Sequence, residues 1–133
     1  MAPVPGAPVF YPGLRYRSGN AAVDFLMRAF GLEAGLQVSA DNGEIDHAEL
    51  WLGQGVMMVG AGADPNGYWN GRTQCACVHV ADPDAHHARA SAACARILQG
   101  PERTAYGARG YIVQDLEGFL WSFGTYRPIR VSV

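Results

Sequence analysis

The sequence predicts an α+β fold in which two βαβββ modules follow one another along the chain. Two strand-turn-strand stretches of similar layout carry this prediction, residues 49–60 (ELWLGQGVMMVG) and residues 111–124 (YIVQDLEGFLWSFG). In the second stretch, residues 115–118 form a turn, with a glycine where a left-handed residue is needed. The alternation after this turn separates bulky apolar side chains from small or polar ones, namely Phe119, Trp121 and Phe123 from Leu120, Ser122 and Gly124.

The first half of the chain contains one complete module. Residues 9–17 alternate and predict a strand, with Pro12 at a position where no N–H is needed for pairing. A helix follows, capped by Ser18 or Asn20 and ended by Gly31, and its apolar residues have helical spacing. The remaining strands of this module are predicted at residues 36–39, 44–52 and 56–60, with a hairpin turn at residues 41–43.

The second half repeats this order. Residues 75–80 predict a strand, a helix runs from Asp84 to about Arg96 after Pro83, and a short strand at 97–100 precedes a hairpin at 109–124. Between the halves lies a polar, glycine-rich connection, whose Tyr68 and Trp69 either lean over a ligand or pack back on the protein. The predicted organisation is an N-terminal arm at 1–8 and one domain at 9–133, with module one at 9–60, the connecting loop at 61–73, module two at 74–124 and a tail at 125–133.

One offset superimposes the two halves. Cys75 minus Tyr11 is 64, and Ser122 minus Met58 is also 64, so the first and last strands of the two modules share one register. The same offset carries Gly60 onto Gly124. An offset shared across the whole span indicates an internal repeat.

Composition excludes several function classes. With 133 residues, of which 49% are hydrophobic, the chain buries a core without metal or disulfide support. The net charge is -2 and the charges are mixed, which predicts no nucleic-acid partner and no membrane partner. All ten cations are arginine, so Schiff-base chemistry on lysine is excluded. Three cysteines without a secretory signal are expected to be reduced thiols of a cytoplasmic protein.

The stretches FYPGLRYR, AVDFLMRAFG, HAELWLGQGVMMV and DLEGFLWSFGTYRP, in this βαβββ order, resemble the vicinal oxygen chelate superfamily. That superfamily includes glyoxalase I, the extradiol dioxygenases and the bleomycin-resistance proteins. The likeness covers residues 9–128 and is greatest to small bacterial glyoxalase-like proteins, although Leu116 replaces the proline usual in their closing turn. The resemblance implies incomplete, cup-shaped mixed sheets with helices outside, a ligand in the cup and a homodimer.

The resemblance also locates the positions of the metal ligands in this superfamily. Metal-bearing members take ligands from the first and last strand of each module, and these positions correspond to Tyr11, Met58, Cys75 and Ser122. A thioether and a neutral hydroxyl cannot replace two anionic glutamates around a divalent ion. The sequence therefore predicts no metal site of the usual type and no cofactor, and the glyoxalase I reaction is not carried over.

Alternation along the strands selects the side chains that face the cup. A mixture of imidazole, carboxylate, guanidinium and aromatic groups suits a small polar, aromatic or anionic ligand. The predicted ligand-binding residues are Tyr11, Arg15, His47, Glu49, Trp51, Met58, Cys75, Cys77, His79, Arg109, Tyr111 and Ser122, with Val113 on the same strand face and Trp69 from the loop.

Each candidate also has a purely structural interpretation. His47 and Glu49, the two catalytic candidates, form either an acid/base pair, ligands of a relocated metal, or a structural hydrogen bond. Cys75 and Cys77 lack the further ligands of a structural zinc site and are expected to be small buried core residues. Arg15 and Arg109 bind an anionic ligand or pair with Glu49. The histidines of the second helix, His86 and His87, are expected to face solvent.

Three functions remain. The first is a metal-independent glyoxalase-like or bleomycin-resistance-like protein that binds a small polar or aromatic molecule in its cup. The second is a lyase or isomerase of the glyoxalase type that uses His47 and Glu49, with or without a divalent metal in a relocated site. The third is an interaction module whose cup is filled by its own side chains or by those of a partner.

Overall fold

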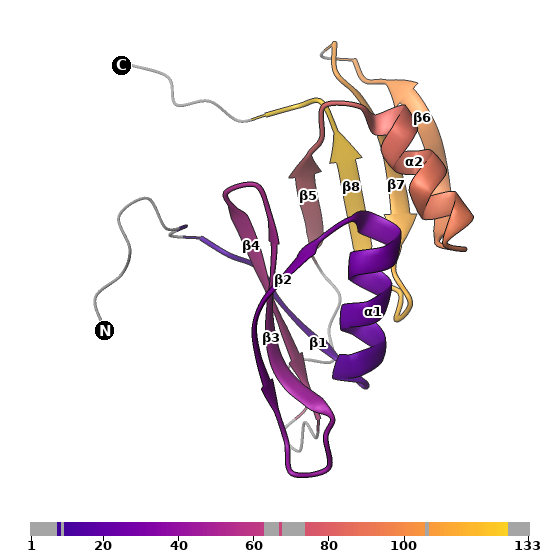
Figure 1. Cartoon of the computed structure of the whole chain (residues 1–133). Helices are drawn as coiled ribbons and strands as arrows, with labels where there is room; N and C mark the ends of the chain where they lie inside the picture. The colour runs from indigo at the N-terminus through magenta and orange to yellow at the C-terminus, as the bar shows by residue number, and fades with distance from the viewer. Residues whose placement is uncertain (1–7, 9, 63–66, 68–73, 106, 128–133) are drawn as a thin grey trace. The chain divides into compact units, whose positions relative to one another are not determined.

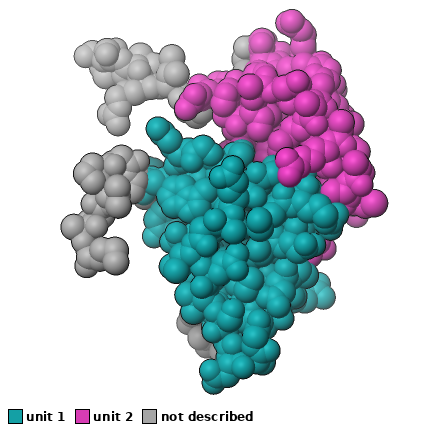
Figure 2. All heavy atoms as spheres, in the orientation of Figure 1, with its two compact units in different colours: residues 1–71 teal, residues 72–133 magenta. Residues whose placement is uncertain are grey.

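The computed structural model of the chain describes residues 8, 10–62, 67, 74–105 and 107–127 (Figure 1). The chain divides into two compact units, residues 1–71 and residues 72–133 (Figure 2). Each unit contains one helix and four strands within its described residues. The elements in chain order are β1 (Gly13–Tyr16), α1 (Gly19–Phe30), β2 (Glu33–Ser39), β3 (Ile45–Leu52), β4 (Gly55–Ala61), β5 (Cys75–His79), α2 (Pro83–Ala92), β6 (Arg96–Arg103), β7 (Arg109–Gln114) and β8 (Leu120–Gly124).

The sheet of the first unit, called here the first sheet, has the strand order β1-β4-β3-β2. β1 is parallel to β4, whereas the other two pairings are antiparallel. Helix α1 packs on β3 and β4. The buried side chains of the strands alternate with more exposed ones, so one face of the sheet is covered by α1 and holds the core. This core contains Tyr16, Ala48, Leu50, Met57 and Val59, together with Phe25, Leu26, Ala29 and Phe30 from the helix.

Helix α1 begins and ends at the residues that its sequence predicts. Of the two candidates for the N-cap, the structure selects Ser18, whose hydroxyl accepts a hydrogen bond from the backbone N–H of Ala21 at 3.1 Å. At the other end, Gly31 has a left-handed backbone with φ 77. The Ser18 hydroxyl also donates to the Glu44 carboxylate at 2.6 Å. The helix N-terminus is therefore tied to the β2–β3 hairpin, 26 residues further along the chain.

The second sheet repeats this plan with the order β5-β8-β7-β6. β5 is parallel to β8, and the other pairs are antiparallel. Helix α2 packs on β6, β7 and β8. Its N-cap is Asp82, whose carboxylate accepts a hydrogen bond from the N–H of Ala85 at 3.1 Å. Ala85 lies 64 positions after Ala21, the residue that makes the corresponding hydrogen bond in α1. The core of this unit contains Ala90, Tyr111, Val113, Phe119, Trp121 and Phe123.

The predicted α+β fold of two βαβββ modules is confirmed. Each sheet is mixed and open, because four strands in the order given do not close into a barrel, and each helix lies on one face of its own sheet (Figure 1). Several boundaries differ from the prediction. β1 is shorter than residues 9–17, with Phe10 95% exposed, while β2 and β6 are longer than expected. α2 ends before Arg96 because Cys94 takes a left-handed backbone, φ 63.

The hairpins of the two modules differ in loop length, which shifts the repeat by one residue. In the first sheet Leu52 pairs with Gly55, so the β3–β4 loop has two residues. In the second sheet Gln114 pairs with Leu120, so the β7–β8 loop has five residues. Met58 and Ser122 therefore differ by 64 positions, whereas their strand neighbours Glu49 and Ile112 differ by only 63. Because of this one-residue shift, each side chain of β7 lies on the opposite face of its sheet from the side chain of β3 that precedes it by 64 positions.

Candidate functional site

The face of the first sheet that lies opposite α1 is called here the open face of that sheet. Residues that pair directly across strands share a face, so the register groups the side chains into rows. One row runs from Arg15 through Gly60 and His47 to Val38. A second row contains Gly13, Met58 and Glu49, and a third contains Val56, Trp51 and Glu33. The prediction that Arg15, His47, Glu49, Trp51 and Met58 share one face is confirmed.

Gly60 leaves space in the middle of the first row. A Cβ atom at Gly60 would lie 3.8 Å from Nη1 of Arg15, and one at Gly62 would lie 4.0 Å from Nη2, so the guanidinium extends along these two glycines. Since neighbouring strands are about 4.8 Å apart, the backbones of Arg15 and His47 are separated by about 10 Å. A guanidinium and an imidazole thus flank a position that has no side chain, and this arrangement suits an anionic or polar group.

His47 and Glu49 both project from β3 on the open face, as their spacing predicts. Within the described residues, neither side chain takes part in a hydrogen bond or an ion pair, so Glu49 does not neutralise Arg15 and does not bond to His47. Both side chains are half-buried. This finding removes the structural hydrogen bond as the explanation of the pair and leaves both groups available to a ligand.

Trp51 supplies the aromatic surface of this face. A Cβ atom at Gly35 of β2 would lie 2.6 Å from Nε1 of Trp51, so the indole rests directly against the backbone of that glycine. Substitution of Gly35 by any larger residue would displace the ring. The glycine therefore fixes a flat apolar surface next to the polar groups of β3.

The open face of the second sheet contains Cys75, Cys77 and His79 from β5 and Ser122 from β8, as predicted. The sulfur atoms of Cys75 and Cys77 lie 3.7 Å apart. Both cysteines are exposed, so the expectation that they are buried core residues is wrong. Although Cys75 is exposed as a residue, partial burial of its thiol and the hydrogen bond to Cys77 raise its pKa to about 11, while a backbone hydrogen bond at Ser122 acts in the opposite direction.

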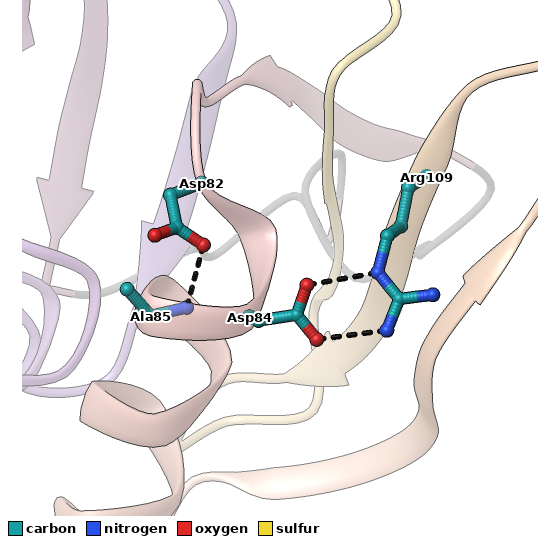
Figure 3. A network of polar contacts seen from close by, with 4 residues as sticks. All are labelled: Asp82, Asp84, Ala85 and Arg109. Atoms are coloured by element: carbon teal, nitrogen blue, oxygen red, sulfur yellow. Dashed lines mark hydrogen bonds and ion pairs between the residues drawn. The ribbon is translucent and has the colours of Figure 1, made fainter.

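Arg109, Tyr111 and Val113 lie on the helix side of the second sheet, so their predicted place in the cup is wrong. Tyr111 and Val113 pair with Phe123 and Trp121, and all four side chains are buried. Arg109 binds Asp84 of α2 through two hydrogen bonds of 2.8 Å (Figure 3). This bidentate pair lowers the pKa of Asp84, because the guanidinium favours the charged carboxylate. The five-residue loop before β8 is the physical reason, since it turns β7 over relative to β3.

The histidines of α2 do not point away from the protein, so this expectation is also wrong. Nδ1 of His86 and the hydroxyl of Tyr111 share a hydrogen bond of 2.6 Å, and the His86 ring lies 4.1 Å from the ring of Phe123. His87 meets Tyr111 edge to face at 5.2 Å. Both histidines therefore belong to the packing between α2 and the second sheet.

The one-residue shift of β7 places on the open face of the second sheet residues that the predicted alternation had assigned to the opposite face. Ile112 is the partner of Ser122, and Gln114 is the partner of Leu120, so both belong to the open face of β7. Gly110 is the partner of Gly124, in the row that begins at His79. The length of the DLEGF loop is the sequence signal that identifies them. The β3–β4 loop has an even number of residues and the β7–β8 loop an odd number, so β3 and β7 cannot present corresponding residues on the same face of their sheets.

Two further predicted site residues are not among the rows of the open faces described above. Tyr11 precedes β1 and is 55% exposed, outside the regular rows of the first sheet. Trp69, like Tyr68, lies outside the described residues.

The donor atoms at the superfamily's ligand positions do not fit a hard divalent ion. Met58 offers a thioether and Ser122 a neutral hydroxyl, each on the open face of its own sheet. Met58 is flanked by Gly13 and Glu49, of which only Glu49 is a ligand type. Among residues 8, 10–62, 67, 74–105 and 107–127, no group of three His, Cys, Asp or Glu side chains is arranged to hold a metal. Met58 and Ser122 therefore do not supply the anionic ligands that a hard divalent ion needs.

The fold and the two open faces define a class of two-module α+β proteins with polar side chains on exposed sheet surfaces. A family model, the Glyoxalase/Bleomycin resistance protein/Dioxygenase superfamily, matches residues 10–123. The chain belongs to this superfamily, as its βαβββ repeat and closing motif predict. No curated protein matches the chain. Neither helix within the described ranges is long and apolar enough to cross a membrane.

Solved structures support this placement. TioX from Micromonospora sp. ML1 is 36% identical, with a TM-score of 0.76, and the match covers 89% of this chain and 99% of TioX. A glyoxalase/bleomycin resistance protein/dioxygenase family enzyme from Burkholderia phytofirmans PsJN is 16% identical, with a TM-score of 0.67 and coverage of 86% and 94%. A glyoxalase/bleomycin resistance protein/dioxygenase from Alicyclobacillus acidocaldarius is 14% identical, with a TM-score of 0.66 and coverage of 92% and 94%. The last two likenesses show the fold alone.

Proposed function

We propose that this protein is a metal-independent member of the superfamily that binds a small polar or aromatic molecule on the open face of its first sheet. The observation that carries this proposal is the row of Arg15, Gly60 and His47, in which two nitrogen-rich side chains flank a glycine. Trp51 adds an aromatic surface on the same face. An aromatic molecule with a carboxylate or another anionic group combines the two features that this face offers.

The proposal of metal independence rests on donor chemistry. Met58 and Ser122 stand where anionic ligands would be needed, and neither supplies a charge. The expected result is that treatment with a chelator leaves ligand affinity unchanged. Binding that disappears on chelation and returns with a divalent ion would contradict it.

A screen of small aromatic carboxylates and their neutral amides by thermal shift, followed by calorimetry, tests the binding function. We expect the carboxylates to raise the midpoint more than the amides, because a bound ligand stabilises the folded state by mass action. Arg15→Gln should weaken carboxylate binding by about 10-fold or more, since a hydrogen bond to a charged group contributes about 1.5–3 kcal/mol. Arg103→Gln, a change on the exposed end of β6, is the matched control and should leave affinity unchanged.

An enzyme that uses His47 and Glu49 is the second candidate. One observation favours it, namely that both side chains lie on one face and make no internal hydrogen bond or ion pair among the described residues. An imidazole and a carboxylate so placed are suited to move a proton in a lyase or isomerase reaction. If a bound ligand is turned over, His47→Ala and Glu49→Gln should each abolish turnover and leave binding in place. Turnover that survives both substitutions excludes this pair.

We also propose that the protein acts as a homodimer in the cytoplasm. The resemblance to superfamily members supports the dimer, and three free cysteines support a reducing compartment. Light scattering after gel filtration tests the dimer, with a single species of twice the 14.3 kDa chain mass expected. A monomer at all concentrations would contradict it.

A further inference from the structure

Two of the three cysteines lie together at the edge of the second sheet. Cys75 and Cys77 are both on β5, both exposed and on the same face of the strand, with their sulfur atoms 3.7 Å apart. β5 has a single strand neighbour, β8, within the described sheet. The two thiols therefore form an accessible pair whose spacing is set by one strand and does not depend on any other unit of the protein.

We propose that Cys75 and Cys77 form a two-thiolate site for monovalent copper, in which each thiol releases its proton to solvent as its sulfur binds the copper ion. Thiolates are soft ligands, and among the biological metals they favour soft ions such as monovalent copper. This proposal is independent of the proposed small-molecule function. It also concerns a different class of ion from the hard divalent metals that Met58 and Ser122 fit poorly.

The distance between the sulfur atoms allows one ion to contact both. Two metal–sulfur bonds of about 2.3 Å reach across at most about 4.6 Å, so a bent bridge spans a separation of 3.7 Å without movement of the strand. A wider, nearly linear arrangement needs only small rotations of two exposed side chains. Both geometries keep the backbone pairing of β5 with β8 intact.

The number of donors selects the ion. Within the described ranges, no third His, Cys, Asp or Glu joins the two thiols in a group that could hold a metal, although His79 lies further along the same face. Structural zinc normally requires four protein ligands, whereas monovalent copper accepts two thiolates as a sufficient set. The strand partners of the two cysteines, Leu120 and Ser122, are uncharged. Two thiolates around a monovalent ion keep a net negative charge, and the exposure of both cysteines to solvent accommodates that charge.

Titration of the reduced full-length protein with monovalent copper, without oxygen and in the presence of a competing chelator, tests the site. We expect one copper ion per chain. Cys75→Ser and Cys77→Ser should each weaken copper binding by at least about 100-fold. Loss of a residue that only supports a metal ligand costs up to about 100-fold in affinity, and loss of a ligand itself should cost no less. Cys94→Ser is the matched control, because Cys94 is also free and exposed but lies beyond α2, and it should leave affinity unchanged.

Three results would overturn the proposal. They are copper binding that persists when both strand cysteines are replaced, an equal loss in the Cys94→Ser variant, and tight binding of one zinc ion per chain by the same two thiols. X-ray absorption of the copper-loaded wild-type protein gives an answer even where a variant fails to fold. Two sulfur neighbours are expected around the copper, and a shell of nitrogen or oxygen atoms contradicts the site.

Discussion

Arg109 binds Asp84 through two parallel hydrogen bonds, from Nε to Oδ2 and from Nη2 to Oδ1, each 2.8 Å long. The pair joins the start of β7 to the first turn of α2 (Figure 3). A carboxylate in that turn also benefits from the partial positive charge of the helix N-terminus. This arginine therefore connects a helix to its sheet, and it is not a ligand-binding group of the open face.

The first prediction concerns the acidity of Asp84. Arg109→Gln should raise the pKa of Asp84 toward its usual value of 3.8, because the hydrogen bonds from the guanidinium lower it in the folded protein. A lowered folded-state pKa contributes stability that is present above the unfolded value and is lost as the pH falls through the folded value. Carboxyl chemical shifts measured between pH 2 and pH 6 check the change.

The control for this titration is a second exposed ion pair of similar type. Arg28 and Asp24 lie 3.6 Å apart on α1, so Arg28→Gln should leave the pKa of Asp84 unchanged. An Asp84 titration that is the same in wild type and Arg109→Gln would show that the bidentate pair does not persist in solution.

The second prediction concerns the buried phenol of Tyr111. Burial raises the pKa of this hydroxyl above its usual value of 10.0, so the folded state favours the neutral form. The resulting stability is fully present below pH 10 and is lost as the pH rises toward the folded pKa. Tyr111→Phe should remove this alkaline loss and cost about 1 kcal/mol at neutral pH, since it deletes the hydrogen bond with His86. Unfolding curves at neutral and alkaline pH measure both effects.

Tyr11→Phe provides the comparison, because Tyr11 is 55% exposed. It should leave stability unchanged within about 0.5 kcal/mol at neutral pH. A Tyr111 phenol that ionises together with the exposed tyrosines in a spectroscopic titration would contradict its burial.

The third prediction tests the glycine pair in the row of His79. Gly110 and Gly124 face one another, and a Cβ atom at Gly110 would lie 2.7 Å from the carbonyl oxygen of Phe123. Gly110→Ala should therefore destabilise the protein by about 1–3 kcal/mol, the usual cost of overpacking. Gly100→Ala on β6 is the control, because nothing lies within 4 Å of its Cβ position, and it should change stability by no more than about 0.5 kcal/mol. Equal effects of the two changes in denaturant unfolding would refute the close approach.

The fourth prediction concerns Asp115, which is buried in the β7–β8 loop. Its carboxylate accepts hydrogen bonds from the backbone N–H groups of Glu117 and Phe119, each at 3.0 Å, and from Nε1 of Trp121 at 3.1 Å. Asp115→Ala should cost about 3 kcal/mol or more, because each buried donor left without an acceptor costs about 1–3 kcal/mol. Tryptophan fluorescence during urea unfolding measures the loss.

Asp115→Asn retains one acceptor oxygen and should cost less than the alanine variant. Asp46→Ala is the surface control on β3, expected to change stability by no more than about 0.5 kcal/mol. If Asp115→Ala behaves like Asp46→Ala, the loop does not depend on its buried carboxylate.

The sequence predicted helix ends and turns correctly where neighbouring residues alone determine them. Ser18 and Gly31 bound α1 because a hydroxyl cap and a left-handed glycine act within one helical turn. The Asp41–Gly43 turn forms as expected, with Gly43 at φ 81. The repeat offset of 64 places the N-caps Ser18 and Asp82 at corresponding positions. Phe10 shows the limit of alternation, because an apolar residue near a strand does not join the sheet unless a partner strand reaches it.

For the candidate site, the sequence predicted the face of β3 correctly and the face of β7 incorrectly. The open face of β3 was predicted from alternation, since Ala48 and Leu50 fix the buried side and leave His47, Glu49 and Trp51 on the other. For β7 the same method failed, because both of its faces carry residues that could be buried. Its face is set by the five-residue loop that joins it to β8.

The sequence alone determined the order of the elements, the internal repeat, the family and the absence of suitable donors at Met58 and Ser122, because each of these depends on residue type and spacing along the chain. Only the tertiary structure decided that Arg109 and Tyr111 face α2, that His86 packs on Phe123, and that the thiols of Cys75 and Cys77 lie exposed and in contact. These outcomes depend on strand register and on which groups meet across the sheet. A one-residue difference in a loop changes both without altering the local pattern of the strand.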